Sequence, residues 1–111
     1  MTTAYRSKLW LERYGWTAAV VEHRRGKFRY DLFRIVDVVA IPPEGSQGIL
    51  FVQSYLDTAR DRERHKGMDC NHEIIQKILK SGSFFVHHRW SKNRGVWRVR
   101  ILDMKGIITE P

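Results

Sequence analysis

An aspartate stands in the middle of an apolar run. From Ile35 to Ile41 every residue except Asp37 is apolar, and the run ends at Pro42 and Pro43, which cannot continue a strand ladder. The pattern predicts a buried strand, where a carboxylate is costly unless something compensates its charge. Two interpretations stay open. Asp37 accepts hydrogen bonds from backbone amides near a sheet edge, or it binds a hard divalent cation, which prefers oxygen ligands on rigid elements.

The next expected strand, ILFVQSYL at 49–56, offers a second oxygen-bearing side chain. Side chains alternate along a strand, so Gln53 and Tyr55 share one face. By the same rule Asp37 shares a face with Val39 in the preceding strand. If the two strands pair, Asp37 and Gln53 converge.

The composition indicates a polyanionic partner. The 111 residues fit one domain, and 20 Lys and Arg against 12 Asp and Glu give a net charge of +8. Nucleic acid is the leading candidate, because the Trp and Tyr residues offer stacking surfaces. No segment is apolar for long enough to cross a bilayer, so we expect no membrane partner. The single cysteine, Cys70, cannot form an internal disulfide, which favours a reducing, intracellular compartment.

Periodicity and turn residues place these side chains in a series of short elements. We expect a helix at 7–14 ended by Gly15, and a charged helical segment at 57–69 capped by Asp57 or Thr58. An amphipathic helix at 71–82 ends at Gly82. The expected strands are 16–23, 29–41 and 49–56, the first two joined by a hairpin at Gly26, and then 83–90 and 96–104, joined by the basic loop 91–95. This order predicts an α+β, α/β/α-like fold with a mixed central sheet flanked by helices.

Several quoted segments resemble those of a known nuclease superfamily. They are a helix ending in RYGW, the strands AAVVEH and ILFVQS, the segment RYDLFRIVDVVAI, a basic helix reaching Lys66, and the tail VHHRWSK. Together they resemble the PD-(D/E)XK superfamily, in particular the Holliday-junction-resolvase-like endonucleases of phages and prokaryotes. The resemblance covers most of the chain. It implies a single nuclease-like domain, 1–111, with a restriction-endonuclease-like fold.

The resemblance also implies roles for individual residues. Asp37 matches the motif aspartate, with Val36 where the eponymous proline would stand, and Gln53 matches the second metal-binding position. Tyr55 stands where a lysine is expected, and a phenol near neutral pH cannot supply a cation. Lys66 resembles a lysine that relatives carry on the following helix, and it is the candidate for the missing charge.

Glu22 is the third acidic candidate. Resolvases often use a glutamate in the N-terminal helix instead, but Glu12 lies too close to Gly15 for that pattern. The alternative for Glu22 is a solvated strand-end glutamate beside arginines. With Asp37 it would join the amide oxygen of Gln53 and the backbone carbonyl of Ser54 in a site for Mg²⁺ or Mn²⁺.

Other polar residues are weaker candidates. Asp31 is more simply explained as a turn residue that bonds backbone amides. The segment DCNH, with Cys70 and His72, and the adjacent His87 and His88 lack the paired spacing of a zinc site. The two adjacent histidines alternate faces on a strand, and we expect them to be solvated.

Basic clusters are the expected DNA contacts. For Arg62 and Arg64, salt bridges on a solvated helix are an equal alternative, because acids are interleaved with them. Trp90 and Trp97 flank the basic loop and are expected to pack across strands more than to stack on bases. The residues that we expect to contact DNA are Arg24, Arg25, Lys27, Arg29, Arg60, Lys92 and Arg94.

The resemblance implies a Mg²⁺-dependent endodeoxyribonuclease, a Holliday junction resolvase of DNA recombination, that cuts branched DNA. It also implies a homodimer, because two related sites suit a four-way junction. The expected location is the cytoplasm of a prokaryotic or phage-infected cell. The alternative is a catalytically inactive DNA-binding module with a nuclease-like fold, for which Tyr55 is the main support. A structural subunit of a nucleoprotein assembly would leave Asp37 unexplained.

Overall fold

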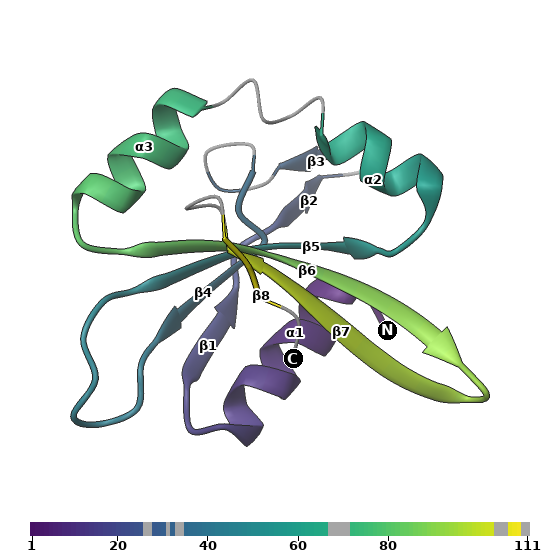
Figure 1. Cartoon of the computed structure of the whole chain (residues 1–111), viewed down its shortest axis with the longest axis horizontal. Coiled ribbons are helices and arrows are strands. Elements are labelled where there is room, and N and C mark those ends of the chain that lie inside the picture. The colour runs from purple at the N-terminus through teal and green to yellow at the C-terminus, as the bar shows by residue number, and fades with distance from the viewer. Residues whose placement is uncertain (26–27, 31, 33–34, 67–71, 104–106, 110–111) are drawn as a thin grey trace.

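The computed structural model describes the chain apart from residues 26–27, 31, 33–34, 67–71, 104–106 and 110–111, and describes backbone alone at 23–25, 28–30, 63–66, 72 and 107–109. The elements follow one another as shown in Figure 1. They are α1 (Thr3–Arg13), β1 (Thr17–Val20), β2 (His23–Arg25), β3 (Phe28–Tyr30), β4 (Val38–Ile41), β5 (Leu50–Leu56), α2 (Ala59–Lys66), α3 (His72–Lys80), β6 (Phe84–Asn93), β7 (Val96–Asp103) and β8 (Ile107–Thr109).

The main sheet is mixed and six-stranded, in the order β1-β4-β5-β6-β7-β8. The strands β1, β4 and β5 form an antiparallel meander, and β6 then joins parallel to β5. A parallel pair needs a long crossover connection, which α2 and α3 supply here. The strands β7 and β8 extend the sheet antiparallel. The fold is therefore a mixed α+β fold, as the element order predicts.

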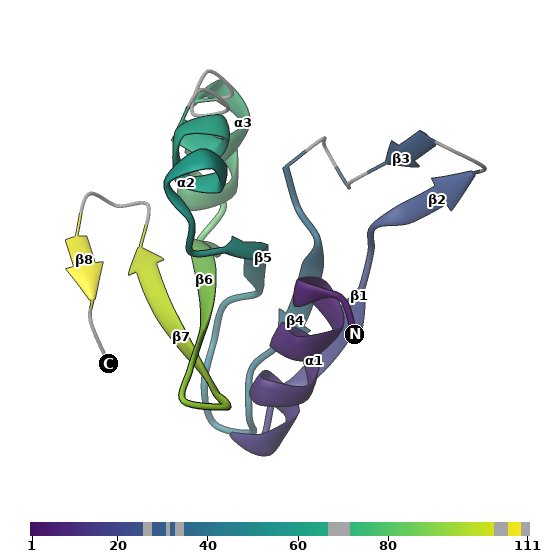
Figure 2. The same cartoon turned by 90° about the vertical axis from the view of Figure 1, so that its right-hand side faces the viewer.

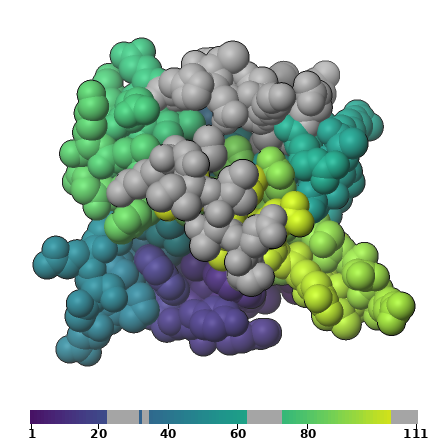
Figure 3. Space-filling model, in the orientation of Figure 1, coloured from purple at the N-terminus to yellow at the C-terminus, as the bar shows by residue number. Residues whose placement is uncertain are grey.

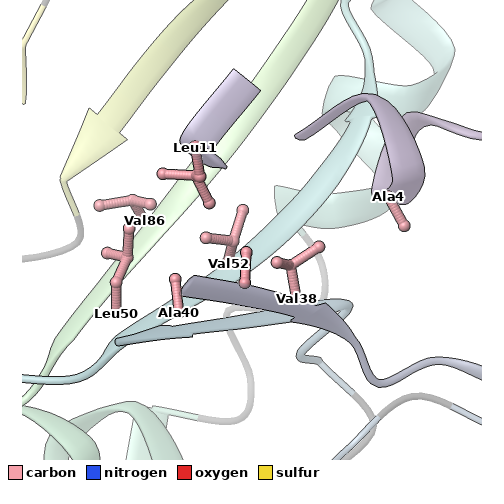
Figure 4. Close-up of a cluster of buried hydrophobic side chains, with 8 residues drawn as sticks. Ala4, Leu11, Val38, Ala40, Leu50, Val52 and Val86 are labelled. Atoms are coloured by element: carbon pink, nitrogen blue, oxygen red, sulfur yellow. The ribbon is translucent and has the colours of Figure 1, made fainter. Parts of the chain in front are cut away.

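Apolar side chains form one cluster on each face of this sheet. Helix α1 contributes Ala4 and Leu11 to the first cluster, which is drawn in Figure 4 with side chains from β4, β5 and β6. Helix α3 contributes Ile75 and Ile78 to the second, where they meet Phe85 of β6. Burial of these side chains on both faces holds the helices against the sheet. Successive residues of β5 and β6 thus face α1 and α3 alternately.

Both ends of α1 follow local capping rules. The Thr2 hydroxyl accepts the N–H of Tyr5 at 3.1 Å, so the helix begins four residues before the predicted Ser7. Gly15, at φ 90°, ends it as predicted, and the N–H of Trp16 reaches back to the carbonyl of Leu11. The predicted start at Ser7 was wrong, because the Thr2 N-cap allows the helix to begin at Thr3.

The predicted strand 29–41 is wrong as one continuous element. Its first residues belong to β3, which pairs only with β2, and β4 begins at Val38. The predicted strand 16–23 likewise ends at Val20. The predicted hairpin is present, with Arg25 opposite Phe28, but it forms a separate two-stranded ribbon that projects from the main sheet (Figure 2). A continuous apolar and β-branched run does not reveal where a chain leaves its sheet.

The second hairpin is longer than predicted. Strand β6 continues to Asn93, and the turn consists of Arg94 and Gly95, at φ 52° and 79°. Positive φ at both turn residues matches the strand twist in two-residue hairpins. The predicted five-residue loop is therefore wrong, and β8 was not predicted. The β6–β7 hairpin projects from the body of the molecule (Figures 1 and 3). Within the described residues, no helix is long and apolar enough to span a bilayer.

Candidate functional site

Asp37 lies where β4 leaves β5. The paired register of these strands begins at Val38 opposite Val52, and the Asp37 N–H still donates to the Val52 carbonyl at 2.8 Å. Beyond this point the Asp37 side chain, in place of a backbone carbonyl of β4, bonds to β5. Its Oδ2 accepts the backbone N–H of Ser54 at 2.8 Å and lies 3.4 Å from the Ser54 hydroxyl. Asp37 is 1% exposed. The predicted hydrogen bond from a backbone amide to Asp37 is confirmed, and it fixes the carboxylate's orientation. The predicted position near a sheet edge is wrong, because β4 lies between β1 and β5.

Gln53 is the next polar side chain across the sheet. It follows Val52, which ends the antiparallel pairing opposite Val38, and the parallel register places it opposite His87 of β6. Gln53 and His87 are both buried. Gln53 is two residues from Phe51, and His87 is two residues from Phe85, so both lie on the α3 face. The predicted convergence of the Asp37 and Gln53 side chains stays a prediction.

Tyr55 forms a hydrogen-bonded chain one step further along the same face. Its hydroxyl lies 2.8 Å from His87 Nδ1 and accepts the Nε–H of Arg89 at 2.9 Å. Arg89 is the register partner of Tyr55 on β6. With the neutral Nε2–H tautomer of His87, the phenol donates to Nδ1. A polar row of Gln53 and His87 is thus followed by a second row of Tyr55 and Arg89.

His88 belongs to the opposite face and has a different role. Its Nδ1 lies 2.9 Å from the Ser7 hydroxyl, which also accepts the indole N–H of Trp90 at 2.8 Å. Burial, and secondarily the charge of His87, lowers the His88 pKa from 6.5 to about 3. His88 is therefore neutral at pH 7 and ties α1 to β6.

The expectation of solvated histidines was wrong for both residues, since His87 is 4% and His88 1% exposed. An isolated strand sequence cannot show that helices cover both of its faces. Trp90 is also buried, as expected for packing. Trp97 lies under the guanidinium of Arg6, whose Cζ is 3.9 Å from the ring centroid.

Glu22 follows the β1 end closest to Asp37. The N–H of its neighbour Val21 donates to the Asp37 carbonyl at 2.8 Å, and the Glu22 Oε2 atom is buried. This enclosure does not fit the solvated alternative. The Ser54 carbonyl, the fourth predicted ligand, lies 3.4 Å from the Thr3 hydroxyl, which donates to it. Lys66 is the last residue of α2, and its side chain lies outside the described atoms.

Among the side chains that the structure describes, no three His, Cys, Asp or Glu residues gather to hold a metal ion. A cation at Asp37 would therefore depend on the amide oxygen of Gln53 and on backbone oxygen as well as on carboxylates. Asp31 and Cys70 lie outside the described residues, and His72 is described in its backbone alone.

The predicted DNA-contacting residues lie in three places. Arg24 and Arg29 are register partners on the β2–β3 ribbon, which also carries Arg25. Arg60 is exposed on α2, and Lys92 and Arg94 are exposed at the end of the β6–β7 hairpin. Lys27 lies outside the described residues.

For Arg62 and Arg64 the sequence predicts either a salt bridge or a phosphate contact. Arg62 pairs with Asp57 at 2.7 Å, which fits the salt-bridge alternative. The Arg64 side chain lies outside the described atoms.

Sequence reasoning missed His87 and Arg89 as parts of the site. The sequence does show that His87 and Arg89 are two positions apart in one expected strand, which places both side chains on the same face. What was missing was the parallel pairing that brings this face beside Gln53 and Tyr55. Comparison of the chain with protein-family models, with curated proteins and with solved structures gave no match.

Proposed function

We propose that this protein is a metal-dependent endonuclease with a restriction-endonuclease-like fold that hydrolyses phosphodiester bonds in branched DNA. The observation that carries the proposal is the group of polar residues around β5. The Ser54 N–H and hydroxyl bind the buried Asp37 carboxylate at the point where β4 leaves β5. Gln53 lies opposite His87 on the α3 face, and the Tyr55–Arg89 row follows it along β5 and β6. Oxygen donors beside a guanidinium suit a cation and a phosphate together.

The fold and the charge support this proposal. A helix, an antiparallel meander, a helical crossover and a parallel strand follow one another in a mixed α+β fold, which supports the proposed architecture. The net charge of +8 favours a polyanionic substrate. The β2–β3 ribbon and the far end of the β6–β7 hairpin both project from the body of the molecule, and their arginine and lysine residues would contact DNA phosphates there.

The donor atoms fit a hard divalent cation, Mg²⁺ or Mn²⁺. Asp37 and Glu22 would provide carboxylate oxygens, Gln53 its amide oxygen and Ser54 its backbone carbonyl. A cation held by these oxygens would lower the pKa of a water bound to it and would stabilise charge on the phosphate. The Ser54 N–H holds the Asp37 carboxylate in one orientation, at 2.8 Å, so this ligand is preorganised by β5 itself.

The second candidate is a DNA-binding module that has this fold without turnover. One observation favours it: the motif lysine is replaced by Tyr55, whose hydroxyl is held between His87 and Arg89. A neutral phenol offers a hydrogen bond, whereas the lysine offers charge.

A cleavage assay with variant proteins separates the two candidates. Labelled four-way junction, flap, duplex and single-stranded DNA are incubated with the protein and Mg²⁺, Mn²⁺ or EDTA. The nuclease cuts with a metal and not with EDTA, with junction or flap preferred, whereas the module retains DNA without cutting it. A homodimer would place paired nicks in the two opposed strands of a junction.

Asp37→Asn tests the assignment of the metal ligand. The asparagine amide oxygen can still accept the Ser54 N–H, so the fold is expected to persist while cleavage falls by at least about 100-fold. DNA binding should stay equal or become tighter, because a negative charge is removed. Glu44→Gln, an exposed loop acid, is the matched control and should leave cleavage unchanged. Cleavage by Asp37→Asn at the wild-type rate would contradict the assignment.

A further inference from the structure

Arg89 is a positively charged side chain beside the proposed metal site. It is half-buried in the middle of β6, and its Nε donates to the Tyr55 hydroxyl at 2.9 Å. Among the side chains that the structure describes, no carboxylate forms an ion pair with it, whereas Arg62 pairs with Asp57. A partly desolvated guanidinium without a protein counter-charge is costly, and an anionic ligand would offset this cost.

The hydrogen bond to Tyr55 also sets which edge of the guanidinium is presented. Arginine has five N–H donors in a planar fork, and here Nε is committed to the phenol oxygen. The two terminal nitrogens remain as a pair that can bind an oxyanion in two parallel hydrogen bonds. Because Tyr55 and Arg89 are register partners, the pairing of β5 and β6 holds this fork in place.

The fork lies close to the oxygen donors of the proposed metal site. Tyr55 and Arg89 are each two residues beyond Gln53 and His87, and two residues of strand span about 6.6 Å. A phosphate coordinated near Gln53 therefore has its other oxygens within reach of a side chain as long as arginine.

We propose that Arg89 binds two oxygens of the DNA phosphate at this site, one through each terminal nitrogen, and supplies, from β6, the positive charge that Tyr55 cannot supply from β5. This inference rests on the proposed function. Tyr55 is then a positioning residue, which holds the guanidinium through its hydroxyl. The positive charge then lies on β6 at the position directly opposite Tyr55 of β5, where the resemblance expects a lysine. Arg100, the exposed register partner of Arg89 on β7, continues the basic row toward solvent and offers the next phosphate contact.

Arg89→Ala is the central variant. Single-turnover cleavage should fall by about 100-fold or more, the loss that follows removal of one transition-state donor. Affinity for junction DNA, measured in EDTA so that no cutting occurs, should fall, and the slope of log affinity against log salt should decrease by about 1. Arg13→Gln, at the far end of α1, is the matched control for loss of one positive charge. It should leave the cleavage rate unchanged.

Chemical rescue separates a phosphate contact from a structural role. Added guanidinium ion at millimolar concentration should restore part of the cleavage by Arg89→Ala, whereas lost packing would not be restored. Arg89→Lys should retain part of the activity, because it keeps the charge without the fork. Arg89→Lys also keeps the inference testable should the alanine variant fail to fold. Suppose that the alanine variant does not fold and that Arg89→Lys has the same cleavage rate and salt slope as wild type. The site would then need only the bulk and the charge of the side chain, and the bidentate contact would be wrong.

The outcomes for the two proposals are distinguishable. If wild type cuts DNA and Arg89→Ala cuts equally well with an unchanged salt slope, the Arg89 inference is wrong and the nuclease stands. If wild type never cuts but the salt slope of Arg89→Ala still falls by about 1, the nuclease is wrong and the phosphate contact stands. If Lys66→Ala loses turnover while Arg89→Ala does not, the charge comes from α2 and the Arg89 inference is wrong.

Discussion

Acid should destabilise this protein through His88, and the size of the effect follows from its burial. The His88 pKa is lowered to about 3 in the folded chain, against 6.5 when unfolded. Between these values the unfolded chain binds one more proton than the folded chain, so the free energy of unfolding falls as the pH falls. The loss approaches about 1.4 kcal/mol per pH unit and amounts to about 2 kcal/mol from pH 7 to pH 5. For a chain of this length that corresponds to roughly 8 °C in melting temperature.

Replacement of His88 by Gln removes the titrating group and keeps a polar side chain near Ser7. The variant should lose about 2 kcal/mol less than wild type between pH 7 and pH 5, whatever its stability at pH 7. Urea unfolding followed by tryptophan fluorescence measures this, since the sequence contains 4 Trp. Staying above pH 5 keeps most carboxylates ionised in both states. The other histidines cancel in the difference between the two proteins.

Ser7→Ala is the control for this reasoning. It removes the hydroxyl that lies between His88 Nδ1 and the Trp90 indole N–H, which should cost about 1 kcal/mol at every pH. Because His88 stays enclosed, the slope against pH should remain that of wild type. Parallel pH profiles for wild type and His88→Gln would refute the assignment of acid sensitivity to this histidine.

Two further predictions concern the backbone and the basic ribbon. Gly48→Ala should destabilise the fold far more than Gly45→Ala: both have positive φ, but a Cβ at Gly48 would lie 2.5 Å from the Phe84 ring, whereas none is within 4 Å at Gly45. Thermal unfolding measures this, and equal losses would contradict it. Replacing both Arg24 and Arg25 by Gln should lower the salt slope of DNA binding by between about 1 and 2. A slope equal to wild type would remove the β2–β3 ribbon from the DNA surface.

Local sequence patterns were enough to predict most elements. Gly15 ends α1, and the hydroxyl of Thr58 accepts the Asp61 N–H at 3.0 Å at the start of α2, as one of the two predicted caps. Such signals are readable because capping and turn formation involve residues only a few positions apart. The apolar run around Asp37 likewise marked a buried strand and its costly carboxylate.

The partners of the site residues were decided by strand pairing. The sequence placed Gln53 and Tyr55 on one face, but it did not show that β6 runs parallel to β5 and brings His87 and Arg89 beside them. It also gave no sign that β4 begins only at Val38, which leaves Asp37 outside the strand with its carboxylate bonded to Ser54.

Local features could be predicted from the sequence and contacts between distant segments could not, for a physical reason. The sequence by itself determined the helices, most strands, the excess of positive charge and the oxygen-bearing candidates, because each depends on neighbours along the chain. Only the tertiary structure decided that His87 and His88 are enclosed and that the cation beside Tyr55 is Arg89. Burial and strand register arise from contacts between segments 30 or more residues apart, as between Tyr55 and Arg89 (34 apart), and no local preference encodes those contacts.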